Sequence, residues 1–460
     1  MRPEQTDIVI VGAGGAGFSA ALSAAESGLK VLLLEKTEWP GGSTRMSGGG
    51  IAATGTSFQK KAGITDSKED WLELWKKRQA TSNPNGPYPD YVFVDQFMDQ
   101  AAVTTEWLAK KQGHSYEQPA GFGQDPEQRI HFPKGTPGGM GGGKQLIANL
   151  SKTLQKRENV TLKTETRVTD LLMDQGKVNG VKFVDKNGPG EIRAKKVIIS
   201  AGGFVQNKKM IAQYIPAAQT ASQFAVGGTG DEGDGIIMAQ KAGAVLYEDP
   251  WVIGMGITAA LPGTGSLLMD WNKLYVDAHG KRFLNEASHY AVVANAVLSA
   301  DEPWIIIDSA KANEDLLKPL NDAVASGRAV KEDSIQELSE QMGISGSTLT
   351  DTLTGYNDGA KSGHDSMGKE VEHVVPVNIA PYYATHIYPV IMGTFGGVKT
   401  NANYEVLDKD EQIIPNLFST GESANKRLYN HVYMSGSSVQ FALTSGRVAG
   451  KVATQQIKQH

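Results

Sequence analysis

Apolar runs alternate with glycine-rich loops at the start of the chain. Residues 7–11, apolar from Ile8 to Val11, predict a buried strand of a parallel sheet. Residues 18–27 are rich in alanine and predict a helix that Gly28 ends. A second strand is predicted at 30–34, where residues 31–34 are apolar, with Glu35 at its end. The chain therefore opens with a strand, a helix and a second strand, which is the order that builds parallel sheets.

The rest of the chain shows two kinds of pattern. Buried-strand patterns return before residue 248 and after residue 394, whereas residues 250–390 alternate short strands with polar helical stretches. We expect strands at 161–163, 181–184, 195–200, 274–276, 304–307 and from 417, and helices at 334–343 and from 436 to 449. This change of pattern predicts an α/β fold in which the middle third is a separate, inserted domain.

Composition narrows the class of protein. A chain of 460 residues is too long for one ordinary core, so we expect two or more domains. The net charge is −5 and no basic tract dominates, so no nucleic-acid partner is expected. The absence of cysteine excludes disulfides and cysteine-ligated metals, and we predict no metal site. No apolar run reaches the length of a membrane span, and we expect a cytoplasmic protein without a membrane partner.

The glycine loop after the first strand predicts a dinucleotide site. Gly12, Gly14 and Gly17 have the GxGxxG spacing between a strand and a helix, and Glu35 lies 18 positions after Gly17. In this context Gly12 permits the tight turn, Gly14 lets a pyrophosphate approach the backbone, and Gly17 lets the helix pack closely on the strand. The free amides at the helix N-terminus bind phosphate, and Glu35 is placed to bind a ribose hydroxyl.

A second glycine loop favours FAD over a nicotinamide cofactor. Residues 41–50 (GGSTRMSGGG) follow Glu35 closely, and a plain nicotinamide-binding domain has no use for them. The loop resembles the segment that passes along the flavin in the fumarate reductase and succinate dehydrogenase flavoprotein superfamily. Six further segments match motifs of that superfamily in the same order: 201–204 (AGGF), 233–235 (GDG), 280–286 (GKRFLNE), 396–398 (GGV), 418–422 (FSTGE) and 446–450 (GRVAG).

The resemblance implies a Rossmann-like FAD-binding domain, residues 1–248 and 394–460, with an inserted α+β capping domain, residues 249–393. Such a cap closes over the substrate and excludes water from hydride transfer. The histidine that carries the flavin in covalent members would fall near Ser43, so we expect non-covalent FAD. The resemblance assigns to FAD the positions Gly12, Gly14, Gly15, Ala16, Gly17, Glu35, Lys36, Gly41, Gly42, Ser43, Thr44, Ser47, Gly48, Gly49, Val168, Ala201, Gly202, Gly203, Asp234, Gly421, Glu422, Ser437, Ser438 and Val439.

The chain departs from the family where fumarate reductases bind their substrate. Those enzymes hold a dicarboxylate with two histidines and an arginine, and a second arginine donates the proton. The corresponding positions here are Met255, Gly393, Tyr433 and Tyr290, and none matches. The residues that would feed the proton-donating arginine fall at Ser266 and Met269, which do not match either. Because a buried carboxylate without a cationic partner is costly, the sequence favours a neutral, aromatic or polycyclic substrate.

Two tyrosines stand where charged residues act in fumarate reductases. A phenol can donate a proton to carbon or a hydrogen bond to a substrate oxygen, and we predict these roles for Tyr290 and Tyr433. The spacing from Glu286 to Tyr290 and the segment 392–397 (MGTFGG) resemble 3-ketosteroid dehydrogenases of the same superfamily. In those enzymes one tyrosine is the acid and base, and another polarises the ketone.

Apolar positions are predicted to line the substrate. They are Trp251, Met255, Phe395, Met434 and Gly436. Further candidates are Tyr116, His289 and His431, although single residues of these types are more often structural.

Several functions fit these residues. The first is an alkene reductase, in which flavin N5 gives a hydride to one carbon and a tyrosine protonates the other. A vinylphenol has no carboxylate, so 4-vinylphenol is the specific substrate we expect. The alternatives are a 3-ketosteroid dehydrogenase, a hydroxycinnamate or fumarate-type enoate reductase, and a flavin-bearing electron-carrier subunit. The sequence leaves the electron donor open between NADH, reduced flavin and a reductase partner.

Overall fold

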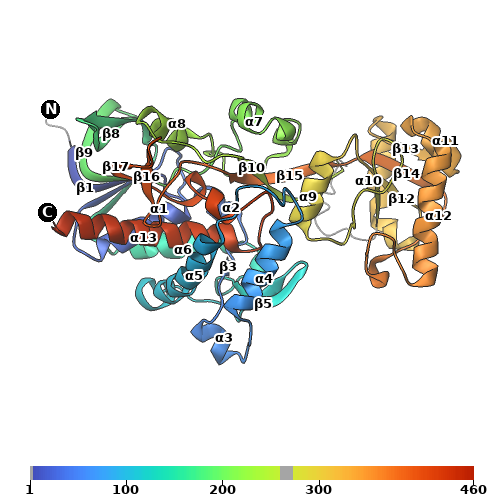
Figure 1. Ribbon diagram of the computed structural model, residues 1–460, viewed down its shortest axis with the longest axis horizontal. Coiled ribbons are helices and arrows are strands. Elements are labelled where there is room, and N and C mark those ends of the chain that lie inside the picture. The colour runs from blue at the N-terminus through green and yellow to red at the C-terminus, as the bar shows by residue number, and fades with distance from the viewer. Residues whose placement is uncertain (1–3, 260–272, 460) are drawn as a thin grey trace. The chain divides into compact units, whose positions relative to one another are not determined.

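The computed structural model describes residues 4–259 and 273–459 of the chain (Figure 1). Positions 266 and 269, discussed above, lie outside the described residues. Two compact units are present: the first comprises Met1–Pro216, Ala225–Ile253 and Met392–His460, and the second Ala217–Phe224 and Gly254–Ile391. Within the described residues, no helix is long and apolar enough to cross a membrane.

The first unit is built on an eight-stranded sheet with the order β16-β17-β9-β1-β2-β6, and β8 joins β9 and carries β7. Its parallel strands are β1 (Glu4–Val11), β2 (Val31–Leu34), β6 (Val160–Lys163), β9 (Gly188–Ile199) and β17 (Ile413–Ser419). Antiparallel strands extend it: β7 (Arg167–Asp174), β8 (Lys177–Asp185) and β16 (Glu405–Leu407). A small sheet contains β3 (Ile51–Ala52), β4 (Ala120–Phe122) and β5 (Asp125–His131).

Helices surround this framework in the first unit. They are α1 (Gly15–Ala25), α2 (Gly42–Met46), α3 (Ser57–Lys61), α4 (Lys68–Gln79), α5 (Tyr91–Gln112), α6 (Gly142–Leu154), α7 (Lys208–Tyr214), α8 (Asp234–Lys241) and α13 (Ser437–Gln459). The chain passes between the two units along β10 (Trp251–Thr258) and β15 (Tyr388–Phe395), which pair with each other.

Close packing of α1 against α13 fixes the first turn of α1, and the two helices lie side by side in Figure 1. A Cβ added at Gly446 would lie 2.1 Å from the Ala16 carbonyl oxygen, and one added at Gly450 would lie 2.4 Å from that of Ala20. The Ser23 hydroxyl donates to the Arg447 carbonyl oxygen at 2.8 Å. The segment 446–450 therefore acts through backbone contact between helices, for which only glycine leaves room.

The second unit has a four-stranded antiparallel sheet with the order β11-β12-β14-β13. Both faces of the sheet are buried: Tyr275 and Ile305 belong to one apolar cluster, whereas Leu274 and Ile306 belong to another. The strands are β11 (Leu274–Val276), β12 (Trp304–Ile307), β13 (Ala329–Glu332) and β14 (Tyr382–His386), and the helices are α9 (Tyr290–Ser299), α10 (Glu314–Ala325), α11 (Ile335–Met342) and α12 (Gly346–Ser362).

The α/β class predicted from the sequence is confirmed: the chain contains a Rossmann-like parallel sheet and smaller sheets. The first helix begins at Gly15, three residues before the predicted start, because the glycine loop itself supplies its first turn. The segment 217–224 belongs to the second unit, which the sequence did not predict. The assignment of FAD binding to 1–248 and 394–460, and of capping to 249–393, stays a prediction.

Candidate flavin and substrate site

The loops predicted to bind FAD follow the carboxyl ends of neighbouring parallel strands. Gly12 follows β1, Glu35 follows β2, the 201–203 loop follows β9, and Gly421 follows β17. The chain runs from β1 to β2 on one side, and β9 lies on the other side of β1. Doubly wound sheets bind their ligands at such a switch point, outside the carboxyl ends of the strands.

Hydrogen bonds connect three of the segments assigned to FAD: the loop 12–17, Glu35 and the loop 41–50. The Ala13 amide donates to Glu35 Oε2 at 3.0 Å, and the Gly41 amide donates to the Ala13 carbonyl oxygen at 2.8 Å. The Gly15 amide donates to Thr44 Oγ1 at 3.2 Å. Glu35 is thereby held at the end of β2 beside the N-terminus of α1, where an acidic residue can meet a ribose.

The space around the glycines of the loop 12–17 indicates whether this loop can accommodate a dinucleotide. A Cβ at Gly17 would lie 1.9 Å from the Gly12 carbonyl oxygen, and one at Gly12 would lie 2.4 Å from that of Ser200, so packing requires both glycines. A Cβ at Gly14 would meet nothing nearer than the Gly41 carbonyl oxygen at 3.9 Å. The protein leaves space at Gly14 that its own packing does not use, and a pyrophosphate needs such space at a helix N-terminus.

Two carboxyl groups, Asp231 and Glu422, contact segments that the sequence assigns to FAD. Asp231 accepts a very short hydrogen bond from Ser43 Oγ, which itself accepts from the Gly228 amide at 2.7 Å. Glu422 accepts from the Thr394 amide at 2.7 Å and from Thr394 Oγ1 at 3.0 Å. Burial raises the pKa of both carboxyls, and the charge of Asp231 raises the pKa of Glu422 further. A carboxyl that keeps its proton can donate a hydrogen bond to a ligand.

Asp231 was missed by the sequence reasoning, which chose Asp234 from the same loop. Asp234 instead forms ion pairs with Lys36 at 2.9 Å and with Arg167 at 2.9 Å. The loop 227–235 contains two Gly-Asp pairs, so the sequence held a signal for both acids. Gly202 lies against Asp231, where an added Cβ would be 2.2 Å from Oδ1, and this contact brings the 201–203 loop to the same place.

The remaining positions assigned to FAD occupy three places in the first unit. The Gly143 amide at the start of α6 donates to the Ser47 carbonyl oxygen at 2.9 Å, and a Cβ at Gly49 would lie 2.4 Å from Gly142. Val168 is a buried residue of β7. Ser437, Ser438 and Val439 form the first turn of α13, and Gly421 donates through its amide to Ser445 Oγ of that helix at 2.9 Å.

The end of α4 positions Tyr433 and Met434. Trp75 Nε1 donates to the Leu428 carbonyl oxygen at 2.9 Å, and Gln79 Nε2 donates to that of Val432 at 2.7 Å. Both Tyr433 and Met434 are buried. Burial raises the pKa of Tyr433, and the negative charge of Asp125 acts in the same direction. The Tyr433 phenol is therefore held in its protonated form.

An arginine that the sequence did not predict lies next to this segment. Arg78 Nη1 is 2.9 Å from Asp125 Oδ2 and 3.9 Å from Met434 Sδ, and Nη2 contacts Asp125 Oδ1. No sequence signal marks this pair, because Arg78 stands in a polar helical stretch and its partner is 47 positions away. The sequence therefore did not predict a guanidinium next to Met434, and the carboxylate of Asp125 neutralises its charge.

Phe395, which was predicted to line the substrate, packs in the core of the protein. Its side chain is fully buried and stacks on Tyr429 with 4.2 Å between the ring centroids. Its contact with a substrate stays a prediction, as does that of Met434, which is also buried. His431 and Trp251 are also engaged, because their rings stack at 4.0 Å and His431 Nε2 lies 2.9 Å from Asp249.

Other candidates of the first unit have structural surroundings. Tyr116 is half-buried, and its hydroxyl donates to the Thr105 carbonyl oxygen at 3.2 Å. Gly436 adopts a positive φ of 73°, and a Cβ there would lie 3.1 Å from Ala52. Gly393 lies against the carboxyl of Glu422, 2.8 Å from the place of an added Cβ.

In the second unit, Tyr290 is the first residue of α9. His289 is the N-cap of this helix and accepts from the Ala291 amide through Nδ1 at 3.3 Å, so it has a structural role. Arg282 pairs with Glu286 through Nε at 3.0 Å and Nη2 at 2.8 Å, which stabilises the segment 282–286 before α9. The N-terminal end of a helix stabilises negative charge, such as that of a phenol that has lost its proton. Met255 is a half-buried residue of β10.

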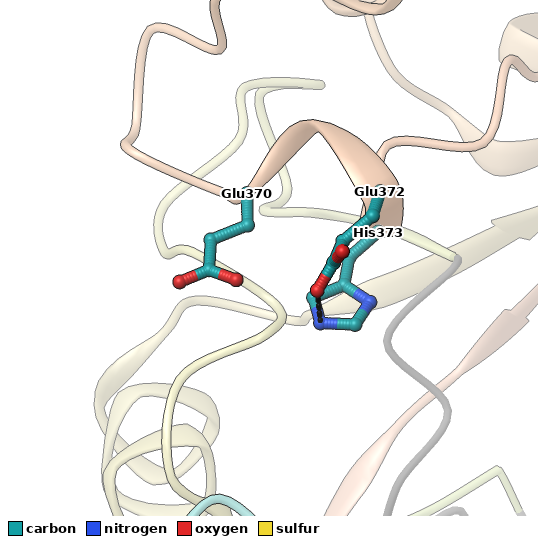
Figure 2. A group of neighbouring side chains, drawn as sticks. All are labelled: Glu370, Glu372 and His373. Atoms are coloured by element: carbon teal, nitrogen blue, oxygen red, sulfur yellow. Dashed lines mark ion pairs between the residues drawn. The ribbon is translucent and has the colours of Figure 1, made fainter.

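Figure 2 shows a group of possible metal ligands in the second unit, Glu370, Glu372 and His373. Their ligand atoms lie within 4.8 Å of one another, and His373 Nε2 is 3.6 Å from Glu372 Oε1. Both glutamates are exposed, and exposed acidic groups of this kind are common without a metal. The cluster assigns no metal, and the absence of a metal site stays a prediction.

Comparison with known proteins places the chain in a family. The family model for the FAD binding domain matches residues 7–439, so the chain belongs to this family of fumarate reductase and succinate dehydrogenase flavoproteins. It is 30% identical over 471 residues to fumarate reductase (cytochrome) of Shewanella frigidimarina, covering 99% of this chain and 78% of that protein. It is 29% identical over 502 residues to vinyl phenol reductase of Lactiplantibacillus plantarum, covering 100% of this chain and 98% of that protein.

A solved structure with the same fold is 3-ketosteroid-Δ4-(5α)-dehydrogenase from Rhodococcus jostii RHA1 in complex with 4-androstene-3,17-dione. It aligns with a TM-score of 0.78 at 25% identity, over 98% of this chain and 97% of that one. The predicted cofactor, FAD, is confirmed by the family. The chain is an FAD-dependent oxidoreductase that acts on CH–CH groups, of the fumarate reductase family that reduces C=C bonds.

Proposed function

We propose that this protein reduces a conjugated C=C bond of a neutral aromatic substrate, and that 4-vinylphenol, reduced to 4-ethylphenol, is the best candidate. One observation carries the proposal. The four positions that correspond to the substrate-binding and proton-donating residues of fumarate reductases hold methionine, glycine and two tyrosines, at 255, 393, 433 and 290. The arginine found near Met434 is already paired with Asp125. A substrate carboxylate would therefore lack a free cation, which disfavours its burial.

The two tyrosines suit different roles. Bound FAD, once reduced, supplies a hydride to one carbon of the double bond. Burial and the charge of Asp125 both oppose ionisation of Tyr433, so this phenol suits a hydrogen bond to a substrate oxygen. Tyr290 lies at the N-terminus of α9, where the helix dipole favours the charge left after proton donation. We therefore assign proton donation to Tyr290.

A vinylphenol is a substrate on which Tyr290 and Tyr433 could both act in these roles. Protonation of its terminal carbon, with loss of the phenol proton, gives a neutral quinone methide whose benzylic carbon accepts a hydride. The phenol oxygen then regains its proton, so the substrate gains one proton and one hydride in total. A hydrogen bond from Tyr433 to that oxygen stabilises the electron density that shifts between ring and oxygen. The vinyl phenol reductase relative aligns over the full length of this chain, which supports the proposal.

Replacement of Tyr290 tests the proposal. Photoreduced Tyr290→Phe enzyme, mixed anaerobically with 4-vinylphenol, should reoxidise its flavin about a hundredfold or more slowly, without loss of bound FAD. Tyr383→Phe is the matched control, because Tyr383 is a buried tyrosine of the same unit whose hydroxyl donates to Asn321 Oδ1 at 3.2 Å. An unchanged rate in Tyr290→Phe would remove Tyr290 from this role.

A 3-ketosteroid dehydrogenase is the second candidate, because the steroid-bound structure aligns with almost the whole chain. It would use the same residues in the reverse direction, with a tyrosine accepting a proton. Incubation with a 3-ketosteroid and an electron acceptor decides between the two: 1,2- or 4,5-desaturation would replace the reductase proposal.

For the reductase, we propose NADH, reduced flavin or a reductase partner as electron donor. Anaerobic assays with NADH alone and with reduced FMN distinguish a direct nicotinamide donor from a flavin or protein donor. Reduction by neither would favour the protein partner.

A further inference from the structure

We propose that Arg78 and Asp125 form a specificity-determining pair, in which Asp125 masks a guanidinium that would otherwise attract a substrate carboxylate. The proposal rests on the proposed function, in which Tyr433 contacts the substrate, and on the prediction that Met434 lines it. It adds that selectivity for neutral compounds depends on the neutralisation of the Arg78 charge by Asp125, and not only on the absence of charged residues.

The geometry of the pair is bidentate. Arg78 Nη1 lies 2.9 Å from Asp125 Oδ2, and Nη2 contacts Oδ1, so both carboxylate oxygens engage the two terminal nitrogens. Paired, parallel hydrogen bonds of this kind are the strongest that arginine makes with a carboxylate. The same Nη1 is 3.9 Å from Met434 Sδ. The guanidinium is therefore in contact with the side chain of Met434, the residue that follows Tyr433.

Because the pair is buried, the charge of Arg78 has a strong effect on its surroundings. The side chains of Arg78 and Asp125 are each 8% exposed. A guanidinium removed from water without a partner is strongly destabilising, so Asp125 is what permits an arginine at this place. Because the pair has no net charge, a neutral ligand near Met434 is not penalised. If Asp125 lost its charge, the field of Arg78 would act on the region beside Met434 with little screening.

A second buried pair on the same strand supplies a control. Arg129 of β5 pairs with Asp66 at 2.7 Å, and the side chains are 5% and 6% exposed. Its guanidinium lies over the Trp71 ring, 5.9 Å from the centroid, rather than against Met434. Asp66→Asn therefore leaves a buried arginine without its carboxylate but should not alter ligand choice, whereas Asp125→Asn should.

Equilibrium binding to the FAD-loaded, oxidised enzyme tests the masking without turnover. The two probes are 4-vinylphenol and 4-hydroxycinnamate, which differ by one carboxylate, and perturbation of the flavin spectrum reports their Kd values. Asp125→Asn should shift the ratio of the two Kd values toward 4-hydroxycinnamate by about 10- to 100-fold, the worth of one charge-assisted hydrogen bond. Arg78→Gln leaves the Asp125 charge and should shift the ratio about tenfold in the opposite direction.

The double variant separates masking from a structural role. Arg78→Gln combined with Asp125→Asn removes both charges and should restore the wild-type ratio to within about threefold. A purely structural pair would weaken both probes equally in every variant. If Asp125→Asn does not retain FAD, Arg78→Gln and the double variant still decide, because equal ratios in these and the wild type would overturn the proposal.

Failure of the proposed function would give a different experimental result from failure of the masking proposal. Suppose that the wild-type enzyme fails to reduce 4-vinylphenol, while the Kd ratio still responds to Asp125→Asn and not to Asp66→Asn. This result would refute the proposed substrate but would still support the masking of Arg78 by Asp125. Binding of neither probe by any variant would overturn both. An equal response to Asp66→Asn and Asp125→Asn would overturn the masking alone.

Discussion

Gly14→Ala separates what the fold requires at the N-terminus of α1 from what FAD requires. An alanine Cβ would lie 3.9 Å from the nearest protein atom, the Gly41 carbonyl oxygen, which is an ordinary contact. The φ angle of Gly14 is −79°, a value that any residue adopts. The free energy of unfolding of the FAD-free protein should therefore change by less than about 1 kcal/mol.

FAD affinity should fall much more. The methyl group occupies the space left for the pyrophosphate, and loss of one backbone hydrogen bond to a charged group costs about 1.5–3 kcal/mol. This cost corresponds to a Kd for FAD about 10 to 100 times higher. Titration of the FAD-free protein with FAD, followed by flavin fluorescence, measures the Kd, and urea unfolding of the same protein measures stability.

Gly17→Ala is the contrasting variant, because its Cβ would lie 1.9 Å from the Gly12 carbonyl oxygen. We expect it to lower stability as well as FAD affinity, since the backbone of α1 must move. Wild-type affinity in Gly14→Ala would refute the reasoning, and so would a large loss of stability in that variant.

Two further predictions concern buried side chains of the first unit. Phe395→Ala should cost about 3–5 kcal/mol in the free energy of unfolding, as for a core aromatic residue, and leave the relative KM values of alkene substrates unchanged; a selective rise in KM without loss of stability would return Phe395 to the substrate site. Lys426 is fully buried, and burial lowers its pKa to about 8 from a usual 10.5. Between these values the folded state has released the proton that the unfolded state still binds, so stability rises with pH. The unfolding free energy of wild type minus that of Lys426→Met should increase by about 3 kcal/mol from pH 8 to 10.5, and parallel curves would contradict this.

Local patterns were sufficient to predict the carboxyl edge of the parallel sheet. The strand before Gly12, the GxGxxG spacing and Glu35 lie within 30 residues of one another, and their chemistry depends on that order alone. Gly446 and Gly450 were read correctly as a motif, yet their role in packing α13 against Ala16 and Ala20 became visible only in the fold.

Pairings between distant residues could not be predicted in the same way. Arg78 and Asp125 are 47 positions apart, and Ser43 and Asp231 are 188 apart, so only the tertiary structure shows that they meet. Phe395 was assigned to the substrate because a core position and a pocket wall favour the same apolar side chain. The sequence alone does not distinguish the two environments, and only the structure shows that Phe395 stacks on Tyr429.

Selectivity between uncharged and doubly charged alkenes tests the account most directly. Photoreduced wild-type enzyme is mixed anaerobically with 4-vinylphenol or with fumarate, and the second-order rate of flavin reoxidation is measured for each. Because the positions that bind the dicarboxylate in fumarate reductases hold no cationic residue here and Arg78 is paired with Asp125, we predict a rate for 4-vinylphenol about a hundredfold or more above that for fumarate, equivalent to the loss of one charged contact in the transition state. A rate for fumarate that equals or exceeds that for 4-vinylphenol would contradict the proposed preference for a neutral substrate.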